Sequence, residues 1–400
     1  MHYTIDIRNL NQAKTALKQI EVTEAGIDLM ADKMLHINIK MKDVKLAAAN
    51  ILKQEMLSLG ADAAVAKGVV TGKAEYSDVI LSGSLNQFNK LSHKLEKQSW
   101  FGLSEIRQSI IDIMQAFQSE NQGIMKIRDK TFEKNKTWLM GILNVTPDSF
   151  SDGNLFNTPK KALDHCIEMI KQGVDIIDIG GESSRPGSDP LNEDDEIQRV
   201  IPVIETIRKV SDIPISVDTY HAETARLSIE AGADIINDIS ALRFDQKMTD
   251  VLKTQPHIPI ILMHMQGMPK TMQNEPFYHD VIADILSFFD ERISYCKAHG
   301  IEKHRIILDP GIGFGKRLED NLMILNQLSA FSSFGCPVLL GASRKSFINQ
   351  IYPSLPQERL MGSLSTSALA FQHGINFVRV HDVKAHREFL SVLQSVREGL

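Results

Sequence analysis

From Leu139 onward, short apolar runs alternate with longer segments in which apolar residues recur every three or four positions. The first run, residues 139–143, ends in a polar loop, and apolar side chains then share one helical face over residues 159–172. A short, wholly apolar run is typical of a parallel strand buried on both faces, and the three-to-four spacing is typical of an amphipathic helix. The pattern therefore predicts a strand–loop–helix unit that is repeated.

Seven further units of this kind extend to the end of the chain. We expect their strands at residues 174–180, 213–218, 233–237, 258–263, 305–309, 337–341 and 377–381. Such a pattern indicates a parallel sheet covered by helices, which is either a (β/α)8 barrel or a doubly wound sheet. Eight units in about 275 residues match the usual size of the barrel, and no G-x-G-x-x-G motif opens the first helix. We therefore predict an α/β fold, a (β/α)8 TIM barrel, over residues 124–400.

Residues 1–120 do not share this repeat. Strands are expected at residues 34–40, 68–71 and 78–82, and helices at residues 44–59, 85–98 and 103–117. We interpret this part as a small α+β domain of unknown role. Residues 125–138 alternate between apolar and polar, which predicts a hairpin with its turn near residues 133–135 that plugs the bottom of the barrel.

Composition narrows the possible partners. The net charge of −6 gives no basic field for nucleic acid. The first residues lack the apolar core of a secretory signal, and no apolar run approaches the roughly 20 residues that cross a bilayer. Cys166, Cys296 and Cys336 lie far apart and form no C-x-x-C motif, so we expect reduced thiols. A soluble cytoplasmic protein that binds neither nucleic acid nor membranes is expected.

Polar or charged residues close the predicted barrel strands. They include Asn144, the loop of residues 181–187, Asp218, Asn237, Asp238, His264, Asp309, Lys345, Arg379 and His381. In this type of barrel, catalytic groups gather at the carboxyl ends of the strands. Contact with water explains many polar strand ends, but it does not explain an Asp that closes an otherwise apolar run, as at Asp218 and Asp309.

Two kinds of chemistry converge at this end. Asp218, Asn237 and Asp309 with Lys345 suit a flat heterocycle that has an amidine-like edge, because a carboxylate accepts two neighbouring N–H groups. A second, anion-seeking group combines the cationic residues and nearby hydroxyls: Arg185, Arg379, His381, Ser183, Ser184 and Ser343. Asn144 and Asp152 add oxygen ligands suited to Mg²⁺, which binds through few protein oxygens and phosphate.

These residues stand in motifs that resemble those of the dihydropteroate synthase family. The motifs are Gly141–Gly153, Ile179–Gly187, Ser216–Tyr220, Ile236–Ser240, Leu262–Met265, Leu308–Lys316, Gly341–Ser346 and Arg379–Val383, in the order of the family. The resemblance covers about residues 124–400. One departure is Ser184, where the family commonly has Thr, which retains the hydroxyl and loses a methyl group.

The resemblance implies an enzyme that joins p-aminobenzoate to 6-hydroxymethyl-7,8-dihydropterin diphosphate, giving 7,8-dihydropteroate and pyrophosphate. By motif match, the pterin would be held by Asp218, Asn237, Met263, Asp309, Phe314 and Lys345. The diphosphate would be held by Asn144, Ser184, Arg379 and His381, with Mg²⁺ near Asn144 and Asp152. The p-aminobenzoate pocket would be formed by Phe150, Arg185, Pro186, Lys345 and Ser346. The resemblance also implies a homodimer, and it assigns catalysis to Asp218, Asp309, Lys345, Arg379 and His381.

Two other readings stay open at this stage. A pterin-dependent methyltransferase shares the barrel and the ring pocket but needs no diphosphate site. A catalytically silent paralogue would bind pterin without reaction. Release of pyrophosphate, with and without p-aminobenzoate, separates all three.

Overall fold

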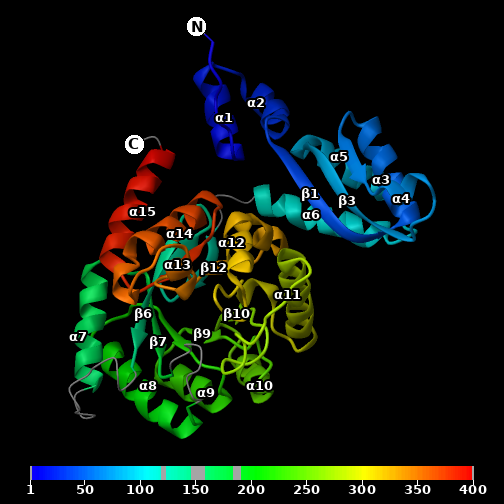
Figure 1. Cartoon of the computed structure of the whole chain (residues 1–400). Coiled ribbons are helices and arrows are strands. Elements are labelled where there is room, and N and C mark those ends of the chain that lie inside the picture. The colour runs from blue at the N-terminus through cyan, green and yellow to red at the C-terminus, as the bar shows by residue number, and fades with distance from the viewer. Residues whose placement is uncertain (1, 119–122, 146–157, 183–190, 399–400) are drawn as a thin grey trace. The chain divides into compact units, whose positions relative to one another are not determined.

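The computed structural model describes residues 2–118, 123–145, 158–182 and 191–398, which form two compact units with the boundary at residues 120–121 (Figure 1). The second unit alternates strands with helices. Its strands are β4 (Gly123–Ile127), β5 (Lys130–Glu133), β6 (Trp138–Asn144), β7 (Ile176–Gly180), β8 (Ile215–Asp218), β9 (Ile235–Asp238), β10 (Ile260–Met263), β11 (Ile306–Asp309), β12 (Leu339–Leu340) and β13 (Phe377–Val380). Its helices are α7 (Thr158–Lys171), α8 (Glu193–Arg208), α9 (Ala222–Ala231), α10 (Lys247–Thr254), α11 (Val281–Ala298), α12 (Leu318–Asn326), α13 (Ser346–Ile351), α14 (Leu360–Gln372) and α15 (Val383–Glu398).

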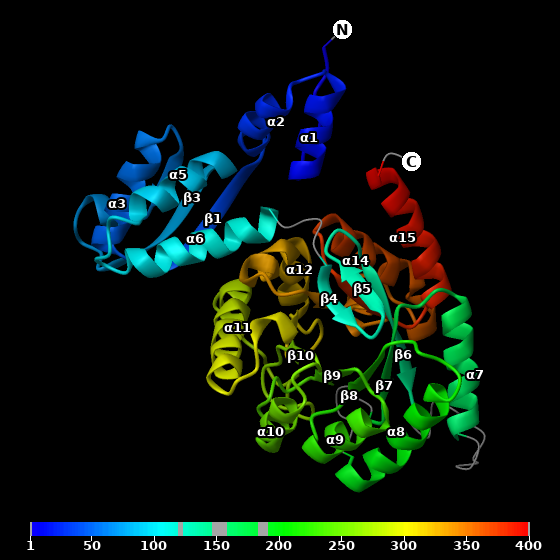
Figure 2. The ribbon, with the colours of Figure 1, turned by 180° about the vertical axis from the view of Figure 1, so that it is seen from behind.

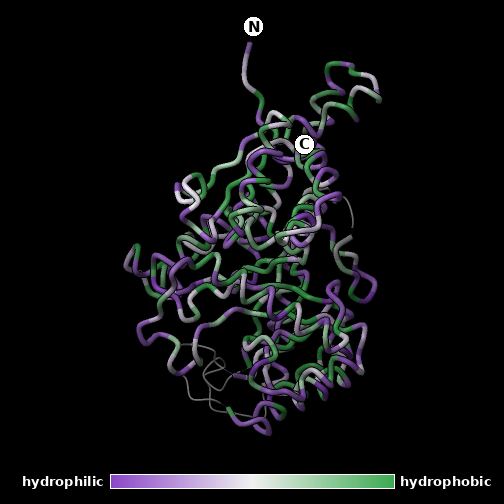
Figure 3. Tube along the Cα trace, turned by 90° about the vertical axis from the view of Figure 1, so that its right-hand side faces the viewer, coloured by the Kyte–Doolittle hydropathy of each residue, from purple (hydrophilic) through white to green (hydrophobic). Residues whose placement is uncertain are grey.

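Strands β6 to β13 form one parallel sheet in the order β11-β10-β9-β8-β7-β6-β13-β12. A further parallel bridge between Leu308 and Val338 joins the two ends of this order, so the sheet is a nearly closed barrel. The helices lie around the outside of the strands (Figure 1, Figure 2). Hydrophobic and hydrophilic residues alternate along the trace of the chain (Figure 3), and helices with one buried face are expected to show such a mixture. The predicted (β/α)8 TIM barrel is confirmed.

The interior of the barrel is built in layers, because alternate residues of each strand face inward. The lowest layer is wholly apolar and buried. It consists of Met140, Ile176, Ile235, Ile261, Ile307, Leu339 and Phe377, and the hairpin residues Met125, Ile127 and Phe132 pack against it. The ring of Phe132 lies with its centre 5.5 Å from that of Phe377. The predicted plug at the N-terminal end of the barrel is therefore confirmed.

The turn of this hairpin lies elsewhere than predicted. Strands β4 and β5 pair antiparallel with Ile127 opposite Lys130, so the turn is Arg128–Asp129, and the expected position near residues 133–135 is wrong. Arg128 has a left-handed φ of 52°, which two-residue hairpin turns require. Its side chain donates to Asp234 at 2.7 Å. The residues of this turn are not the Asn-Gly pair that usually marks a two-residue hairpin, and the turn is accompanied by the contact of Arg128 with Asp234.

The first unit is a small α+β fold with its own core. Its elements are α1 (Leu10–Gln19), α2 (Glu24–Met30), β1 (His36–Lys45), α3 (Leu46–Ser58), β2 (Asp62–Val65), α4 (Lys67–Val70), β3 (Tyr76–Ser84), α5 (Leu85–Leu95) and α6 (Leu103–Gln118). The sheet is antiparallel in the order β1-β3-β2. The strand expected at residues 68–71 is instead the short helix α4, in which Val69 is buried and Val70 exposed. Strand β2 and helices α1 and α2 were not predicted.

No helix in the described ranges of either unit is long and apolar enough to cross a membrane.

Candidate active site

The interior layer above the apolar one contains four of the polar side chains predicted for the site. Two residues beyond the apolar layer on each strand come Ile142, Asp178, Asn237, Met263, Asp309, Gly341 and Arg379. Strand β8 adds Asp218, which is paired with Asn237 in the sheet. The alternation of the strands thus brings residues from all eight strands of the barrel to one level near their carboxyl ends.

Arg379 lies between two carboxylates. Its Nε donates to Asp178 Oδ2 at 2.6 Å, and its Nη2 donates to Asp218 Oδ2 at 2.8 Å. Burial by itself would lower the pKa of Arg379, but the two carboxylates raise that pKa above its ordinary value, so the guanidinium remains charged. Burial raises the pKa of Asp218 to about 7, although Arg379 opposes the shift. The predicted ring-binding and diphosphate-binding residues are therefore in direct contact.

Asp309 ends β11, and the loop after it folds tightly against the end of β10. Asp309 Oδ1 accepts the N–H of Gly311 at 2.7 Å, and the N–H of His264 donates to the Asp309 carbonyl at 2.9 Å. Gly311 has a φ of +67°, and a Cβ there would stand 2.1 Å from the His264 carbonyl oxygen, so only glycine fits. Burial raises the pKa of Asp309 above its ordinary value.

Lys345 reaches the same level from the loop after β12. Its Nζ lies 3.9 Å from the centre of the Phe314 ring. A Cβ at Gly313 would stand 3.4 Å from Lys345 Cδ, so this glycine lets the lysine lie close across the loop. Burial lowers the pKa of Lys345 to about 8, and Asp309 opposes the shift. Phe314 and Met263 belong to one buried apolar cluster, as their predicted place in a ring pocket requires.

His381 contributes a neutral imidazole. Its Nδ1 lies 3.1 Å from Ser343 Oγ, and its backbone N–H donates to the same oxygen at 3.2 Å. Burial lowers the pKa of His381 to about 3, and the nearby charges of Arg379 and Arg344 lower it further. We expected His381 to add positive charge, and this expectation is corrected, because burial and, to a smaller extent, its cationic neighbours disfavour protonation.

The remaining predicted residues fall into two groups. Asn144 ends β6 and is half-buried, and Ser346 is exposed at the start of α13. Five further residues lie outside the described ranges, so their roles stay predictions: Phe150, Asp152, Ser184, Arg185 and Pro186.

Sequence reasoning missed two buried ionisable residues in contact with this site. Asp178 stands in the middle of β7 and is fully buried. Lys316 is 4% exposed, and its Nζ lies 3.0 Å from His264 Nδ1, 3.2 Å from the His264 carbonyl oxygen and 3.1 Å from that of Phe314. Lys316 belongs to the motif Leu308–Lys316, which the sequence analysis names. For Asp178, the available signal is that an acid occupies an inward-facing position of an apolar run.

A polar network beside Asp218 was also missed. Glu196 Oε2 accepts the hydroxyl of Thr219 at 2.7 Å and lies 3.0 Å from His221 Nδ1. Tyr220 donates its hydroxyl to Glu182 Oε2 at 3.0 Å. Burial raises the pKa of Glu182, and Tyr220 opposes the shift. These bonds join the end of β7 to helix α8 and the loop after β8.

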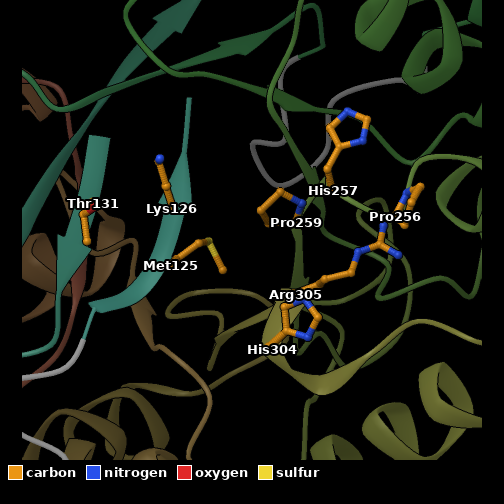
Figure 4. Close-up of a pocket in the computed structure, with 8 residues that line it drawn as sticks. All are labelled: Met125, Lys126, Thr131, Pro256, His257, Pro259, His304 and Arg305. Carbon is orange, nitrogen blue, oxygen red and sulfur yellow. The ribbon is translucent and has the colours of Figure 1, made fainter. Parts of the chain in front are cut away.

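A hollow at the opposite end of the barrel has different chemistry. It has a volume of about 430 Å³ and lies between hairpin residues, including Lys126, and the exposed rings of His257 and His304 (Figure 4). The guanidinium of Arg305 also borders it but donates to three backbone carbonyl oxygens. This hollow shares no residue with the polar layer.

Comparison with known proteins bears on the barrel unit. Residues 140–381 match the family model described as pterin binding enzyme. A dihydropteroate synthase of Bacillus subtilis is 49% identical over 251 residues, which cover 63% of this chain and 85% of that protein. A solved dihydropteroate synthase of Xanthomonas albilineans with 4-aminobenzoic acid is 40% identical with a TM-score of 0.65, covering 69% of this chain and 99% of that one.

The first unit is matched in a different relative. A probable bifunctional folylpolyglutamate synthase/dihydropteroate synthase of Halobacterium salinarum is 36% identical over 394 residues. The match covers 98% of this chain and 47% of that protein. The arrangement of an α+β unit before the barrel therefore has a counterpart inside a longer protein.

Proposed function

The chain belongs to the dihydropteroate synthase family of pterin-binding enzymes, and from this we propose that it condenses 6-hydroxymethyl-7,8-dihydropterin diphosphate with p-aminobenzoate. The products are 7,8-dihydropteroate and pyrophosphate, so the enzyme is a transferase of folate biosynthesis. The single observation that carries the proposal is the contact of Arg379 with Asp218, which sets an anion-binding group beside a ring-binding one.

The pterin ring binds in the polar layer. Asp218, Asn237 and Asp309 provide acceptors for its N–H groups, and Lys345 donates to its carbonyl oxygen or ring nitrogen. Met263 and Phe314 supply the apolar surface that a flat ring needs. Because Asp309 is held by the N–H of Gly311, its carboxylate is oriented before the ligand arrives.

The diphosphate binds above this layer. Arg379 supplies the charge, and the neutral imidazole of His381 supplies a hydrogen-bond donor, with Asn144 and Ser184 as further polar contacts. We also propose that Asn144 and Asp152 hold Mg²⁺. The amide oxygen of Asn144 is a hard ligand of the type that this ion takes, and Gly180 leaves space beside it, since a Cβ there would stand 3.5 Å from that oxygen. Bound Mg²⁺ would neutralise part of the phosphate charge.

The reaction is a dissociative substitution. The aniline nitrogen of p-aminobenzoate is already a nucleophile, so the demanding step is departure of the diphosphate from the exocyclic carbon. Arg379 neutralises charge that develops on the leaving oxygens. Asp218 and Asp309, bonded to the N–H edge of the ring, stabilise positive charge on the pterin. The amine then attacks the exocyclic carbon in a pocket formed by Phe150, Arg185, Pro186, Lys345 and Ser346. As the C–N bond forms, the nitrogen loses one proton to solvent, which gives the secondary amine of the product.

Release of pyrophosphate tests this function. Purified protein, the pterin diphosphate and Mg²⁺ are incubated with and without p-aminobenzoate, and pyrophosphate and dihydropteroate are measured together. Stoichiometric formation of both products only with p-aminobenzoate is expected. Absence of pyrophosphate release under either condition, with intact pterin binding, would instead support a silent pterin-binding protein.

A further inference from the structure

We propose that Asp178 is a positioning residue for the reaction, which fixes Arg379 and Asn237 at the same time and so couples the diphosphate end of the site to the ring end. This inference rests on the proposed function. Asp178 is 0% exposed and lies in the middle of β7, at an inward-facing position between Ile142 and Ser216 on the neighbouring strands.

The first contact of Asp178 orients the guanidinium of Arg379. Asp178 Oδ2 accepts from Arg379 Nε at 2.6 Å, while Asp218 accepts from Nη2 at 2.8 Å. Two carboxylates bound to two nitrogens of a planar, rigid guanidinium fix its plane. Within the described residues Nη1 makes no hydrogen bond, so this is the nitrogen left to donate to a phosphate oxygen. An amide in place of Asp178 would accept more weakly, so Asp218 would be the one charged partner left to hold the guanidinium, and its plane could turn.

The second contact determines which end of the Asn237 amide faces the ligand. Asn237 Nδ2 lies 3.4 Å from Asp178 Oδ2. An ionised carboxylate only accepts hydrogen bonds, so Asn237 must direct its NH₂ group toward Asp178. Its carbonyl oxygen is then left to accept an N–H of the bound ring. If Asp178 were an amide, either orientation of Asn237 could be satisfied, and the selection would be lost.

The other oxygen of Asp178 distinguishes it from a carboxylate that only supports the fold. Asp178 Oδ1 is buried and has no hydrogen-bond partner within the described residues, and the same holds for Ser216 Oγ beside it. Buried carboxylate oxygens are almost always satisfied, because an unpaired one is costly. Two such atoms on adjacent strands point to a donor that arrives from outside the protein, either one water between them or a group of the ligand.

The chain offers a matched control. Asp175 is also buried, at 5% exposed, and pairs with Lys130 at 2.5 Å and with Arg387. It stands just before β7, below the apolar layer and away from the polar layer. Asp175→Asn therefore removes a buried, salt-bridged carboxylate from the same part of the fold without touching the site.

The experiment compares Asp178→Asn with Asp175→Asn in two calorimetric binding measurements. Binding of pyrophosphate reports on Arg379. Binding of 6-hydroxymethylpterin, which carries no diphosphate, reports on Asn237. For Asp178→Asn we expect both to weaken roughly tenfold or more, the effect of losing hydrogen bonds to a charged group, with the KM for p-aminobenzoate unchanged. Asp175→Asn should lower the melting temperature and leave both unchanged. If Asp178→Asn weakened the binding of only one of the two ligands, the proposed coupling would be wrong. Equal effects on binding in the two variants would also contradict it.

The experiment also remains decisive if the proposed function is wrong or if the Asp178→Asn variant does not fold. If unaltered protein forms no dihydropteroate, the proposed function fails, but the two binding measurements still decide the role of Asp178. If Asp178→Asn does not fold, a structure of the unaltered protein with pyrophosphate decides instead. The proposal requires Arg379 Nε to stay on Asp178 while Nη1 contacts phosphate, and a guanidinium that has left Asp178 contradicts it.

Discussion

The ammonium group of Lys345 lies 3.9 Å from the centre of the Phe314 ring, in a position to hold the lysine over the ring pocket. A cation this close to an aromatic face is stabilised by the ring's negative potential. Phe314 is itself fixed, since its carbonyl oxygen accepts from the buried Lys316 at 3.1 Å. Phe314 therefore presents the charge of Lys345 as well as an apolar face for the ligand.

Replacing this ring should weaken pterin binding. Phe314→Leu keeps an apolar side chain but removes the aromatic face, and a loss of about 1–2 kcal/mol corresponds to a KM for the pterin diphosphate about 5- to 30-fold higher. Phe314→Tyr retains the ring and serves as the control. Steady-state kinetics with each substrate varied in turn would check this. Equal kinetics for the Leu and Tyr variants would show that the aromatic face has no part in binding.

The pH dependence of kcat/KM should be bell-shaped in the free enzyme. Burial raises the pKa of Asp218 to about 7 and lowers that of Lys345 to about 8. Below pH 7 Asp218 takes up a proton and ceases to be a full acceptor, so kcat/KM should fall with decreasing pH. Above pH 8 Lys345 loses its charge, so kcat/KM should fall again.

Two variants assign the limbs of this profile. Asp218→Asn should lower the rate and remove the acidic limb. Lys345→Arg should move the alkaline limb beyond the measured range, because a guanidinium does not deprotonate there. A profile that keeps both limbs in both variants would assign the titrations to other groups.

Gly311 should be intolerant of any side chain. A Cβ would stand 2.1 Å from the His264 carbonyl oxygen, so Gly311→Ala must displace the loop that holds Asp309. Misplacing that carboxylate should reduce kcat/KM on the order of 100-fold. Gly300 also has a positive φ, of 80°, but nothing lies within 4 Å of its Cβ position. Gly300→Ala should therefore cost roughly 1–2 kcal/mol of stability and leave the kinetics unchanged.

The hairpin plug should matter for stability and not for chemistry. Phe132 is fully buried between Trp138 and Phe377, and Phe132→Ala should lower the free energy of unfolding by about 3–5 kcal/mol. The neighbouring Thr131 is exposed, so Thr131→Ala is the control. Urea denaturation measures the first quantity, and kcat under native conditions should match the unaltered protein. A loss of kcat in a folded Phe132→Ala variant would contradict the prediction that the hairpin affects stability and not the reaction.

Removal of residues 1–120 should leave the reaction intact. The first unit has its own core, and the Bacillus subtilis relative matches the chain over 251 residues, 85% of that protein's length. We expect the truncated barrel to retain kcat and both KM values within about twofold. Circular dichroism establishes that the barrel is folded before the assay. A folded but inactive barrel would assign the first unit a part in the reaction.

Much of the barrel could be predicted because two patterns in the sequence are strong: the short apolar runs of the strands, and the apolar residues at every third or fourth position of the helices. Nearly all-apolar runs that end in a polar residue identified the strands, and Asp218 and Asp309 were found because each stands at such an end. Asp178 was missed for the same reason. It lies inside the run, and only the inward-facing parity that it shares with Ile176 marks it as part of the site.

Other features depend on contacts that the sequence does not display. The hairpin turn at Arg128 is accompanied by a bond to Asp234, more than 100 positions away. The neutral state of His381 follows from burial and from the charges of Arg379 and Arg344, which assemble only in the folded barrel. Helix α4 could not be told from a strand, because four residues are too few for either period to show.

The layered interior has a consequence for how such a chain can vary. Apart from Asp218, which follows Ser216, each side chain of the polar layer is two positions from an apolar residue of the layer below, and that spacing keeps it pointing inward. Inserting or deleting one residue within a strand would turn its ligand-binding group outward beneath the helices and bring an apolar group in. Insertions and deletions should therefore be confined to the connecting loops. Within the strands, substitutions should be tolerated far more often than changes of length.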